Sequence, residues 1–298
     1  DVGDINGDGF VDIIDVSYGP NEVIYNSGAI LSTQASWDKS YSENSLQVDF
    51  SDIDNDGDLD LAIGNYAGVN ELYLNFEGSY PQTPNWTSND SLYTTQIEFG
   101  DLNNDGYMDF VVGNQFQPTQ VFANTGGSFF STASWESTCP CYNTQDISLG
   151  DIDGDGYLDI VEVLRSAGKR ILFTSGNEQF INDWSDGSSS DLGDIDNDGD
   201  LDLIVGNMNE PNQIFLNSGG SFPSSPNWVS SDSRDTRSVT LVDIDGDDYL
   251  DLVVGNFGEK NQIFFNNFGV MSTTASWESY DSLQTTGLTA GDVDRDGD

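Results

Sequence analysis

Residues 52–65 read DIDNDGDLDLAIGN, a cluster of aspartates followed at once by an apolar run. The pattern D-x-D/N-x-D-G/D-x-x-D recurs along the chain, with most copies 48 to 50 residues apart. The copies begin at Asp4, Asp52, Asp101, Asp151, Asp194, Asp243 and Asp292. A period of roughly 20–50 residues is the signature of a repeat architecture, so this repeat decides the fold before any local feature does.

Each repeat reads as four short β-strands. An alternating run precedes the aspartate cluster, an apolar run follows it, a third run comes after a turn, and a fourth carries tryptophan. These lengths and alternations are typical of strands, and no segment shows helical periodicity. We expect the turn before the third run at Gly64-Asn65, Gly113-Asn114, Gly206-Asn207 and Gly255-Asn256.

Four strands in about 49 residues is the size of one propeller blade, so the predicted fold is an all-β β-propeller. We expect one domain over residues 1–298, with repeats starting near 1, 47, 96, 146, 189, 238 and 286. A lone blade cannot bury both of its faces, so the blades must stack. The last repeat stops at Asp298, and we expect seven blades with the remainder of the seventh absent from this chain; six is the alternative.

The tryptophans share one repeat position, at Trp37, Trp86, Trp135, Trp184, Trp228 and Trp277. One interpretation is that they wedge between neighbouring blades. The other is a ring of stacking platforms for sugars. We favour packing, because an identical residue in every repeat serves packing more often than recognition.

The aspartate clusters predict calcium loops between the first and second strands. Ca²⁺ takes about six to eight oxygens at roughly 2.3–2.6 Å. Alternate residues of a tight loop point to one side, so positions 1, 3 and 5 can converge, position 7 can offer its carbonyl, and position 9 can close the shell. Solvated Asp/Gly turns are the alternative, but they do not require Asp at the same odd positions in seven repeats.

The predicted ligands at positions 1, 3, 5, 7 and 9 are Asp4, Asn6, Asp8, Phe10, Asp12; Asp52, Asp54, Asp56, Asp58, Asp60; Asp101, Asn103, Asp105, Tyr107, Asp109; Asp151, Asp153, Asp155, Tyr157, Asp159; Asp194, Asp196, Asp198, Asp200, Asp202; Asp243, Asp245, Asp247, Tyr249, Asp251; and Asp292, Asp294, Asp296, Asp298. Asn6 and Asn103 lower the ligand charge of their loops. Asp248 stands where the other loops have glycine, and aspartate tolerates the left-handed region that this position needs. We expect six to seven Ca²⁺ ions, and that loop 6 binds more weakly.

The charge balance fits bound cations. The chain has 52 acidic and 8 basic residues, a net charge of −44 and no histidine. More than half of the acids lie in the loops, where cations would offset their repulsion. Nucleic acid is excluded as a partner because no basic stripe exists, and no stretch is long and apolar enough to span a membrane.

Enzymatic activity is not expected. The absence of histidine excludes Ser-His-Asp and Cys-His chemistry. Paired carboxylates could serve glycoside hydrolysis, but the loops already account for the abundant aspartates. Cys139 and Cys141 form a single C-P-C that is no zinc ribbon, and both a strained bridge and two thiols remain open. No signal peptide is visible. We expect an extracellular or cell-surface location, because millimolar Ca²⁺ is found outside cells.

The stretches DIDNDGDLDLAIGN (52–65) and NELYLN (70–75), with their copies, resemble the FG-GAP/VCBS repeats. Such repeats build the calcium-bearing propeller of integrin α chains and of several microbial lectins and surface proteins. The resemblance covers essentially the whole chain and implies that the loop calcium is structural. Phe-Gly and Gly-Ala-Pro signatures are mostly absent, so the chain resembles the microbial type more than integrins.

The resemblance also implies that ligands meet the face opposite the calcium loops. Six residues after the last Asp of each loop, or next to that position, lie the candidate ligand-binding residues Tyr18, Tyr66, Phe116, Arg165, Met208 and Phe257. Ordinary loop side chains are the alternative. Repeat 4 departs from its siblings, with Val163-Leu164 in place of Gly-Asn and the bases Lys169 and Arg170 nearby.

Together these features predict an extracellular, calcium-stabilised scaffold for binding and adhesion, with a protein or glycan as its ligand. A glycan-binding lectin and a structural subunit of a cell-surface array or filament are the alternatives.

Overall fold

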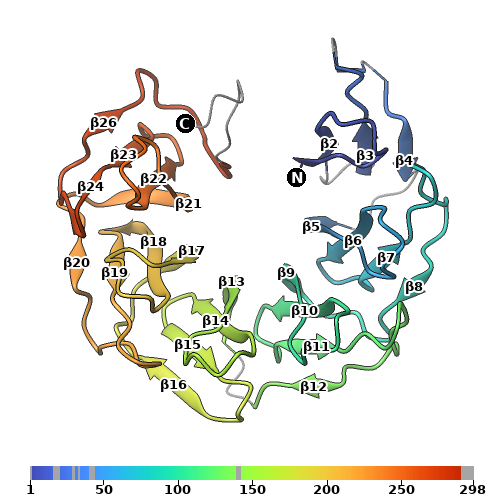
Figure 1. Ribbon diagram of the computed structural model, residues 1–298, viewed down its shortest axis with the longest axis horizontal. Helices are drawn as coiled ribbons and strands as arrows, with labels where there is room; N and C mark the ends of the chain where they lie inside the picture. Colours follow the sequence, from blue (N-terminus) through green and yellow to red (C-terminus); the bar gives the residue numbers. More distant parts are fainter. Residues whose placement is uncertain are drawn as a thin grey trace. The chain divides into compact units, whose positions relative to one another are not determined.

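The computed structural model describes residues 2–15, 21–28, 31–32, 34–39, 44–138 and 142–289. Strands and turns make up these residues, with no helix among them. The predicted fold class is confirmed: the fold is all-β and consists of repeated four-stranded antiparallel sheets, the blades of a propeller (Figure 1). The chain divides into two compact units, Asp1–Thr144 and Gln145–Asp298. The expectation of one domain over residues 1–298 stays a prediction.

The described residues of the first unit form three blades, with the strands of each in chain order. Blade 1 contains β1 (Val2–Gly3), β2 (Asp12–Asp15), β3 (Asn21–Ile24) and β4 (Trp37–Lys39). Blade 2 contains β5 (Ser45–Ser51), β6 (Asp60–Asn65), β7 (Glu71–Tyr73) and β8 (Trp86–Thr87). Blade 3 contains β9 (Thr94–Gly100), β10 (Asp109–Asn114), β11 (Gln120–Phe122) and β12 (Trp135–Glu136).

The second unit follows the same plan. Blade 4 contains β13 (Thr144–Gly150), β14 (Asp159–Leu164), β15 (Gly168–Leu172) and β16 (Glu178–Ile181). Blade 5 contains β17 (Gly187–Gly193), β18 (Asp202–Glu210), β19 (Gln213–Phe215) and β20 (Trp228–Val229). Blade 6 contains β21 (Arg234–Val242), β22 (Asp251–Asn256), β23 (Gln262–Phe264) and β26 (Trp277–Glu278), with the small hairpin β24 (Asn266–Asn267) and β25 (Val270–Met271).

The Gly-Asn pairs are not turns, contrary to the sequence prediction. They form the buried ends of β6, β10 and β22. In β18 the pair Gly206-Asn207 lies in the buried interior of the strand. Glycine is needed for closeness rather than for a turn: a Cβ on Gly64 would lie 2.9 Å from Ile97 Cγ2 of the next blade, and a Cβ on Gly206 would lie 2.6 Å from Thr236 Cγ2. The Asn65 amide then donates to the Val69 carbonyl at 2.7 Å, so it closes the connection that follows.

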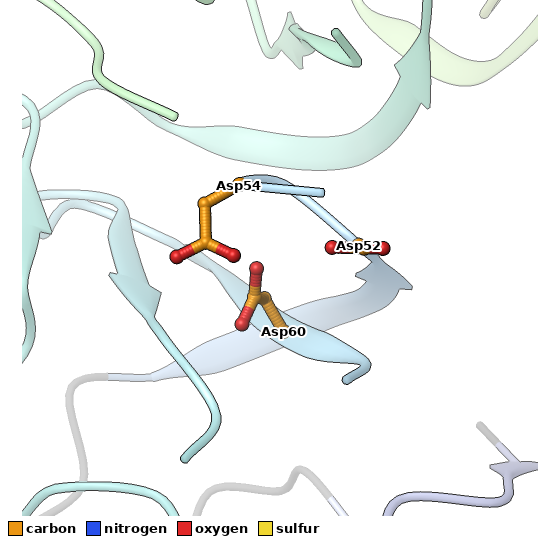
Figure 2. A group of neighbouring side chains, drawn as sticks. All are labelled: Asp52, Asp54 and Asp60. Atoms are coloured by element: carbon orange, nitrogen blue, oxygen red, sulfur yellow. The ribbon is translucent and has the colours of Figure 1, made fainter. Parts of the chain in front are cut away.

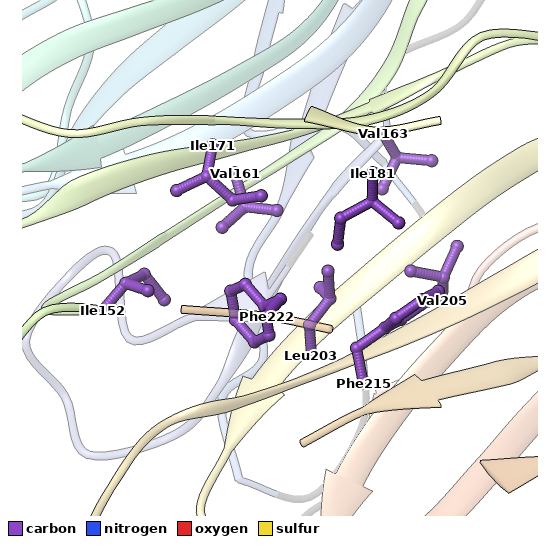
Figure 3. Packing of buried hydrophobic residues seen from close by; sticks show 9 residues of the cluster. All are labelled: Ile152, Val161, Val163, Ile171, Ile181, Leu203, Val205, Phe215 and Phe222. Atoms are coloured by element: carbon purple, nitrogen blue, oxygen red, sulfur yellow. The ribbon is translucent and has the colours of Figure 1, made fainter. Parts of the chain in front are cut away.

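The hydrophobic cores lie between neighbouring blades. One cluster joins blades 1 and 2, another blades 2 and 3, and in the second unit two clusters join blades 4 and 5 and blades 5 and 6. Figure 3 shows the cluster between blades 4 and 5, in which Val161 and Ile171 of one blade face Leu203 and Phe215 of the next (Figure 3). Each blade therefore depends on a neighbour to cover its apolar faces.

The tryptophans act as wedges in three blades. Trp37 packs edge-on against Tyr73 of the following blade, Trp86 against Phe122, and Trp228 against Phe264. The packing interpretation is confirmed for these residues. Trp184 departs from them: it follows β16, has a positive φ of 58° and is 71% exposed.

In blades 1 to 5 the first strand lies at the edge of its blade, whereas β21 of blade 6 also pairs with β18 of blade 5. Side chains of one first strand accept backbone N–H groups of the next, in the pairs Asp49 with Phe99 (3.0 Å), Asp146 with Ser190 (2.6 Å), Ser189 with Val239 (3.2 Å) and Asp191 with Leu241 (2.8 Å). These bonds hold adjacent blades together. Blades 5 and 6 are joined in addition by a short ladder between β18 and β21, so their strands form one eight-stranded sheet.

Residues 284–289 continue this pattern beyond blade 6. Gln284 forms a β-bridge with Phe257, and the Leu288 N–H donates to Ser238 Oγ at 3.2 Å. No strand is assigned at 286–289, and the rest of the seventh repeat, from 290 to 298, lies outside the described residues. The count of seven blades stays a prediction.

Candidate metal centres

The aspartate loops lie between the first and second strands, as predicted, and bring carboxylates together. In loop 2 one carboxylate oxygen from each of Asp52, Asp54 and Asp60 lies within 4.8 Å of the others, and Figure 2 shows the carboxylates of Asp54 and Asp60 facing each other. The same three positions, 1, 3 and 9, converge in loops 4, 5 and 6, as Asp151, Asp153, Asp159; Asp194, Asp196, Asp202; and Asp243, Asp245, Asp251. Three carboxylates that close provide the oxygen donors that a hard divalent cation takes.

The backbone fixes the shape of each loop. Asp52 accepts the N–H groups of Asp56 and Gly57, both at 3.0 Å. Asp60 begins the second strand, is fully buried, and accepts the Ile53 N–H at 2.8 Å. Because these bonds hold positions 1 and 9 at opposite ends of the loop, the carboxylates are oriented before any ligand arrives.

Two loops contain an oxygen that the protein itself leaves unsatisfied. Oδ1 of Asp54 and Oδ1 of Asp196, both at position 3, are buried and have no hydrogen-bond partner. An unpaired buried acceptor is costly and calls for a partner. A cation at the centre of the carboxylates would provide one, so the residues present fit a bound metal.

The electrostatics lead to the same conclusion. Burial raises the pKa of Asp60 to about 6, and the nearby Asp54 and Asp56 raise it further against two backbone hydrogen bonds. Asp202 has its pKa raised to about 6 for the same reasons. The raised pKa values mean that the ionised form of these crowded carboxylates is unfavourable in the protein alone. A divalent cation bound between them would make the ionised form favourable.

Position 5 is not part of the converging group. Asp56 accepts the N–H of Asp58 at 3.0 Å, and the other position-5 aspartates make the same bond two residues ahead, as Asp105 does with Tyr107. Position 6 has the predicted left-handed backbone: φ is 97° at Gly57 and 68° at Asp248. Aspartate thus fits where glycine was expected.

Loops 1 and 3 have asparagine at position 3. The Asn103 Oδ1 accepts the Asp105 N–H at 2.9 Å, and the Asn103 amide lies 3.3 Å from an Asp109 oxygen. Asn6 Oδ1 accepts the Asp8 N–H at 3.0 Å. Both side chains still offer a carbonyl oxygen. The predicted ligands of loop 7, from Asp292 to Asp298, lie outside the described residues.

The candidate ligand-binding residues lie at blade junctions. Tyr66 and Arg165 form isolated β-bridges to Tyr93 and Asp186 of the next blade, and Met208 pairs with Asp235. The side chains differ in access. Phe116 is 66% exposed and Arg165 half-exposed, whereas Met208 is only 5% exposed and so is not presented to a ligand.

The remaining predicted ligand-binding residues and the distinctive residues of repeat 4 follow. The Phe257 ring lies beneath the Arg237 guanidinium at 5.4 Å. Tyr18, Cys139 and Cys141 lie outside the described residues. Lys169 and Arg170, which marked repeat 4 as distinct, are buried in ion pairs with Asp183 and Glu162, so they offer no charge to a ligand.

One set of residues that contacts the loops was missed from the sequence. An asparagine stands 14 or 15 residues after the last Asp of most loops, and its N–H donates to that Asp, as Asn75 does to Asp60 at 2.7 Å. The set is Asn26, Asn75, Asn124, Asn217 and Asn266, with Thr174 in blade 4. Its fixed spacing was the available signal, but the asparagine read as part of a turn.

The sequence matches a known repeat family. A family model described as FG-GAP-like repeat matches residues 4–63, 52–112, 101–162 and 194–254, which together are more than half of the chain. A search of curated proteins gave no match. Among the described residues, no helix is long and apolar enough to cross a bilayer.

Solved structures share the fold at low sequence identity. BBS1N in complex with ARL6DN, soaked with mercury, is 11% identical with a TM-score of 0.68, over 98% of this chain and 83% of that chain. A lectin of Agrocybe aegerita, described as specifically recognising non-reducing terminal N-acetylglucosamine, is 19% identical with a TM-score of 0.61, over 91% and 77%. Sqt1 of Saccharomyces cerevisiae is 13% identical with a TM-score of 0.62, over 95% and 72%. At these identities the likeness concerns the fold alone.

Proposed function

Because the chain belongs to the FG-GAP-like repeat family, we propose that it is a calcium-stabilised binding scaffold that works outside the cell or at its surface. The observation that carries the proposal is the convergence of three carboxylates in each of four loops, with a buried, unpartnered Oδ1 on Asp54 and on Asp196. When bound, the cation supplies neutralising charge and a partner for the unsatisfied carboxylate oxygens. The chain's own residues supply the preformed loop.

The size of the effect supports a structural role for the metal. Extracellular calcium modules bind with Kd of about 10⁻⁴–10⁻³ M. At about ten times Kd, each site adds roughly 1.4 kcal/mol to the free energy of unfolding. Several such sites together reach about 5–10 kcal/mol, which is comparable to the whole stability of a domain. No catalytic role is needed to explain the loops, and we propose that the protein is not an enzyme.

Calcium removal is the direct test. We expect the melting temperature, followed by circular dichroism, to fall by at least about 15 °C between 2 mM CaCl₂ and excess EGTA, because the repelling carboxylates lose their counter-charge. Equal Mg²⁺ should restore little of it, because Mg²⁺ retains its waters. Identical melting curves in CaCl₂ and EGTA would overturn the proposal.

The binding role rests on side chains at the strand ends opposite the loops. Tyr66, Phe116 and Arg165 lie on the connections between the second and third strands of their blades, where a rigid scaffold can present variable residues. A protein ligand there is the first candidate, and adhesion would follow from it. Phe116→Ala and Arg165→Ala, tested separately because they belong to different units, should each weaken binding of a protein ligand without changing the melting temperature.

A glycan is the second candidate ligand, favoured by one hollow on blade 6. Trp277 is 50% exposed and lines a cavity of about 470 Å³ with Asp232, Gln262 and Glu278. An exposed indole beside carboxylates and an amide suits a sugar, because one face of the sugar ring can stack on the indole while its hydroxyl groups donate hydrogen bonds to the carboxylates and the amide oxygen. Binding on a glycan array that Trp277→Ala removes would support this role, and an array without signal would exclude it.

A further inference from the structure

We propose that Asn75, Asn124, Asn217 and Asn266 couple the calcium loops of neighbouring blades, so that Ca²⁺ bound at one loop raises the affinity of the next. The inference rests on the proposed calcium binding, but it concerns how the sites communicate. It assigns these asparagines as positioning residues, since they hold loop backbone rather than the ion.

Asn124 shows the geometry in the first unit. Its amide Nδ2 donates to the Ile53 carbonyl of loop 2 at 2.8 Å and to the Met108 carbonyl of loop 3 at 3.1 Å. Its backbone N–H donates to Oδ1 of Asp109, at position 9 of loop 3, at 2.8 Å. One buried residue thus contacts position 2 of one loop and positions 8 and 9 of the next.

The same bonds recur wherever the asparagine has a preceding blade in its unit. The acceptors of Nδ2 are Ile5 (2.8 Å) and Leu59 (3.0 Å) for Asn75, Ile152 (2.9 Å) and Leu201 (3.1 Å) for Asn217, and Ile195 (2.8 Å) and Leu250 (3.2 Å) for Asn266. Because the same two-carbonyl bridge recurs at four asparagines, it is a regular feature of the repeat that links the loops of neighbouring blades.

At Asn124 and Asn217 a second contact closes the loop of the preceding blade. Oδ1 of Asn124 accepts the N–H groups of Gly127 and Ser128 at 2.9 and 3.0 Å and so shapes the β11–β12 hairpin. That hairpin lies directly on loop 2: a Cβ on Gly127 would be 2.7 Å from the Cβ of Asp54. Position 3 of loop 2, with its unpartnered oxygen, is therefore enclosed by the residue that also holds loop 3.

Coupling follows from the shared bond. An ion that orders loop 3 fixes Asp109 and the Met108 carbonyl. Because Asn124 is bonded to both, its side chain is fixed as well. That side chain then fixes the Ile53 carbonyl, which lies beside Asp52 and Asp54 in loop 2. The next ion then meets a loop with less freedom left to lose, which gives positive cooperativity without a change of fold. The effect must be reciprocal, because coupling free energies are symmetric.

Blade 4 limits the coupled sets. Thr174 stands at the asparagine position, and its N–H and hydroxyl both face Oδ1 of Asp159 in its own blade, at 2.9 and 3.4 Å. A threonine has a single side-chain donor and cannot bridge two carbonyls. The asparagines therefore link loops 1 to 3 in the first unit and loops 4 to 6 in the second.

Site-resolved calcium titration tests the inference. In ¹H–¹⁵N spectra of the whole chain, the amide of Gly106 reports loop 3 and that of Gly57 reports loop 2. We silence loop 2 with Asp52→Ala and Asp54→Ala and expect the loop 3 affinity for Ca²⁺ to fall about fivefold or more, within the usual range of coupling. In an Asn124→Leu background, silencing loop 2 should change loop 3 affinity by less than about twofold.

Asn114→Leu is the matched control. Asn114 is equally buried in blade 3, but its amide donates to Pro118, away from any loop, so coupling should persist. A reciprocal measurement needs no asparagine variant: silencing loop 3 at the same two positions, with Asp101→Ala and Asn103→Ala, should lower loop 2 affinity by the same factor.

The outcomes separate the two ideas. If neither Gly57 nor Gly106 responds to Ca²⁺ in the unmodified chain, the proposed function fails. If both respond, but silencing one loop leaves the other unchanged, calcium binding stands and the coupling is overturned. Coupling that survives Asn124→Leu would also overturn it, because the link would then run through other residues.

Discussion

Blades 4 and 5 adjoin in the second unit and have the same loop and strand order, yet they differ at several positions where blades meet. The cross-strand pair Val205–Gln213 of blade 5 is Glu162–Arg170 in blade 4, and both of those charged side chains are buried. The exchanges, blade 4 first, are Asp146 for Ser189, Glu162 for Val205, Val163 for Gly206, Arg170 for Gln213, and Thr174 for Asn217.

The exchanges occur in compensating pairs. Blade 4 has both the Glu162 carboxylate and the Arg170 guanidinium that neutralises it. At the junction of blades 4 and 5, Val163 faces Gly187. At the junction of blades 5 and 6 the sizes are reversed, and Gly206 faces Thr236. Lys169 likewise has three acceptors, Asp183 at 2.5 Å, Ser185 at 2.7 Å and Gln213 of blade 5 at 2.8 Å. The calcium loop and the strand ladder therefore define a blade, whereas the residues at its junction with the next blade can differ if both sides of the junction change together.

The largest expected effect breaks one side of the buried ion pair. Glu162→Val should lower the free energy of unfolding by about 3–5 kcal/mol, because it removes the carboxylate that offsets the buried Arg170 charge. The double change Glu162→Val and Arg170→Gln restores the pair found in blade 5 and should be neutral or stabilising. Urea unfolding in saturating Ca²⁺ measures both, and a double variant as unstable as the single one would contradict compensation.

The next effect concerns volume at the same junction. A Cβ on Gly187 would lie 2.3 Å from Val163 Cγ1. Gly187→Thr alone should therefore cost about 1–3 kcal/mol through overpacking. Adding Val163→Gly recreates the arrangement of Gly206 with Thr236 and should recover most of that loss. Additive losses in the unfolding curves would show that the two positions do not compensate.

The smallest effect is a dependence on pH that blade 4 has and blade 5 lacks at this position. Burial raises the pKa of Asp146 to about 7, against hydrogen bonds from Ser190. A raised pKa in the folded state makes the charged form unfavourable there, so stability rises as pH falls from about 8 toward 4, where the unfolded chain also becomes protonated.

Asp146→Asn should therefore stabilise the protein by about 1–2 kcal/mol at pH 8, after allowance for partial solvent access, and the gain should vanish near pH 4. Parallel melts across pH, with Asp281→Asn at an exposed position as the control, measure the difference. A gain independent of pH would show that the carboxyl charge is not its cause.

The repeat, the fold class and the position of the metal loops could be predicted from sequence because each is a local pattern with a fixed period. The Gly-Asn pairs could not. A glycine reads as a turn from its backbone freedom, but Gly64 and Gly206 are required by side chains of the next blade, which no local window contains. The bridging role of Asn124 was hidden for the same reason, since Ile53 lies 71 residues away in the chain.

Blade 4 also shows where alignment misleads. Trp184 takes the tryptophan position when the sequence is aligned, yet β16 ends three residues earlier, at Ile181, and Ile181 enters the core instead. The basic residues of repeat 4 suggested a surface for a ligand. Glu162, which pairs with the buried Arg170, lies on the neighbouring strand. Which residues of two strands pair cannot be predicted from the sequence of either strand alone.

The bonds that backbone N–H groups donate between first strands have a direction along the chain, whereas the Ser188 hydroxyl donates the other way, to the Thr236 carbonyl at 2.6 Å. In each pair the acceptor belongs to the earlier blade and the N–H to the later one, as with Asp49 and Phe99 or Asp191 and Leu241. An open strand edge recruits other chains and leads to aggregation. On the ribosome, where the N-terminal part emerges first, a repeat that makes these backbone bonds would meet acceptors that its predecessor already displays, so this part of its edge need not wait for a later partner to be covered.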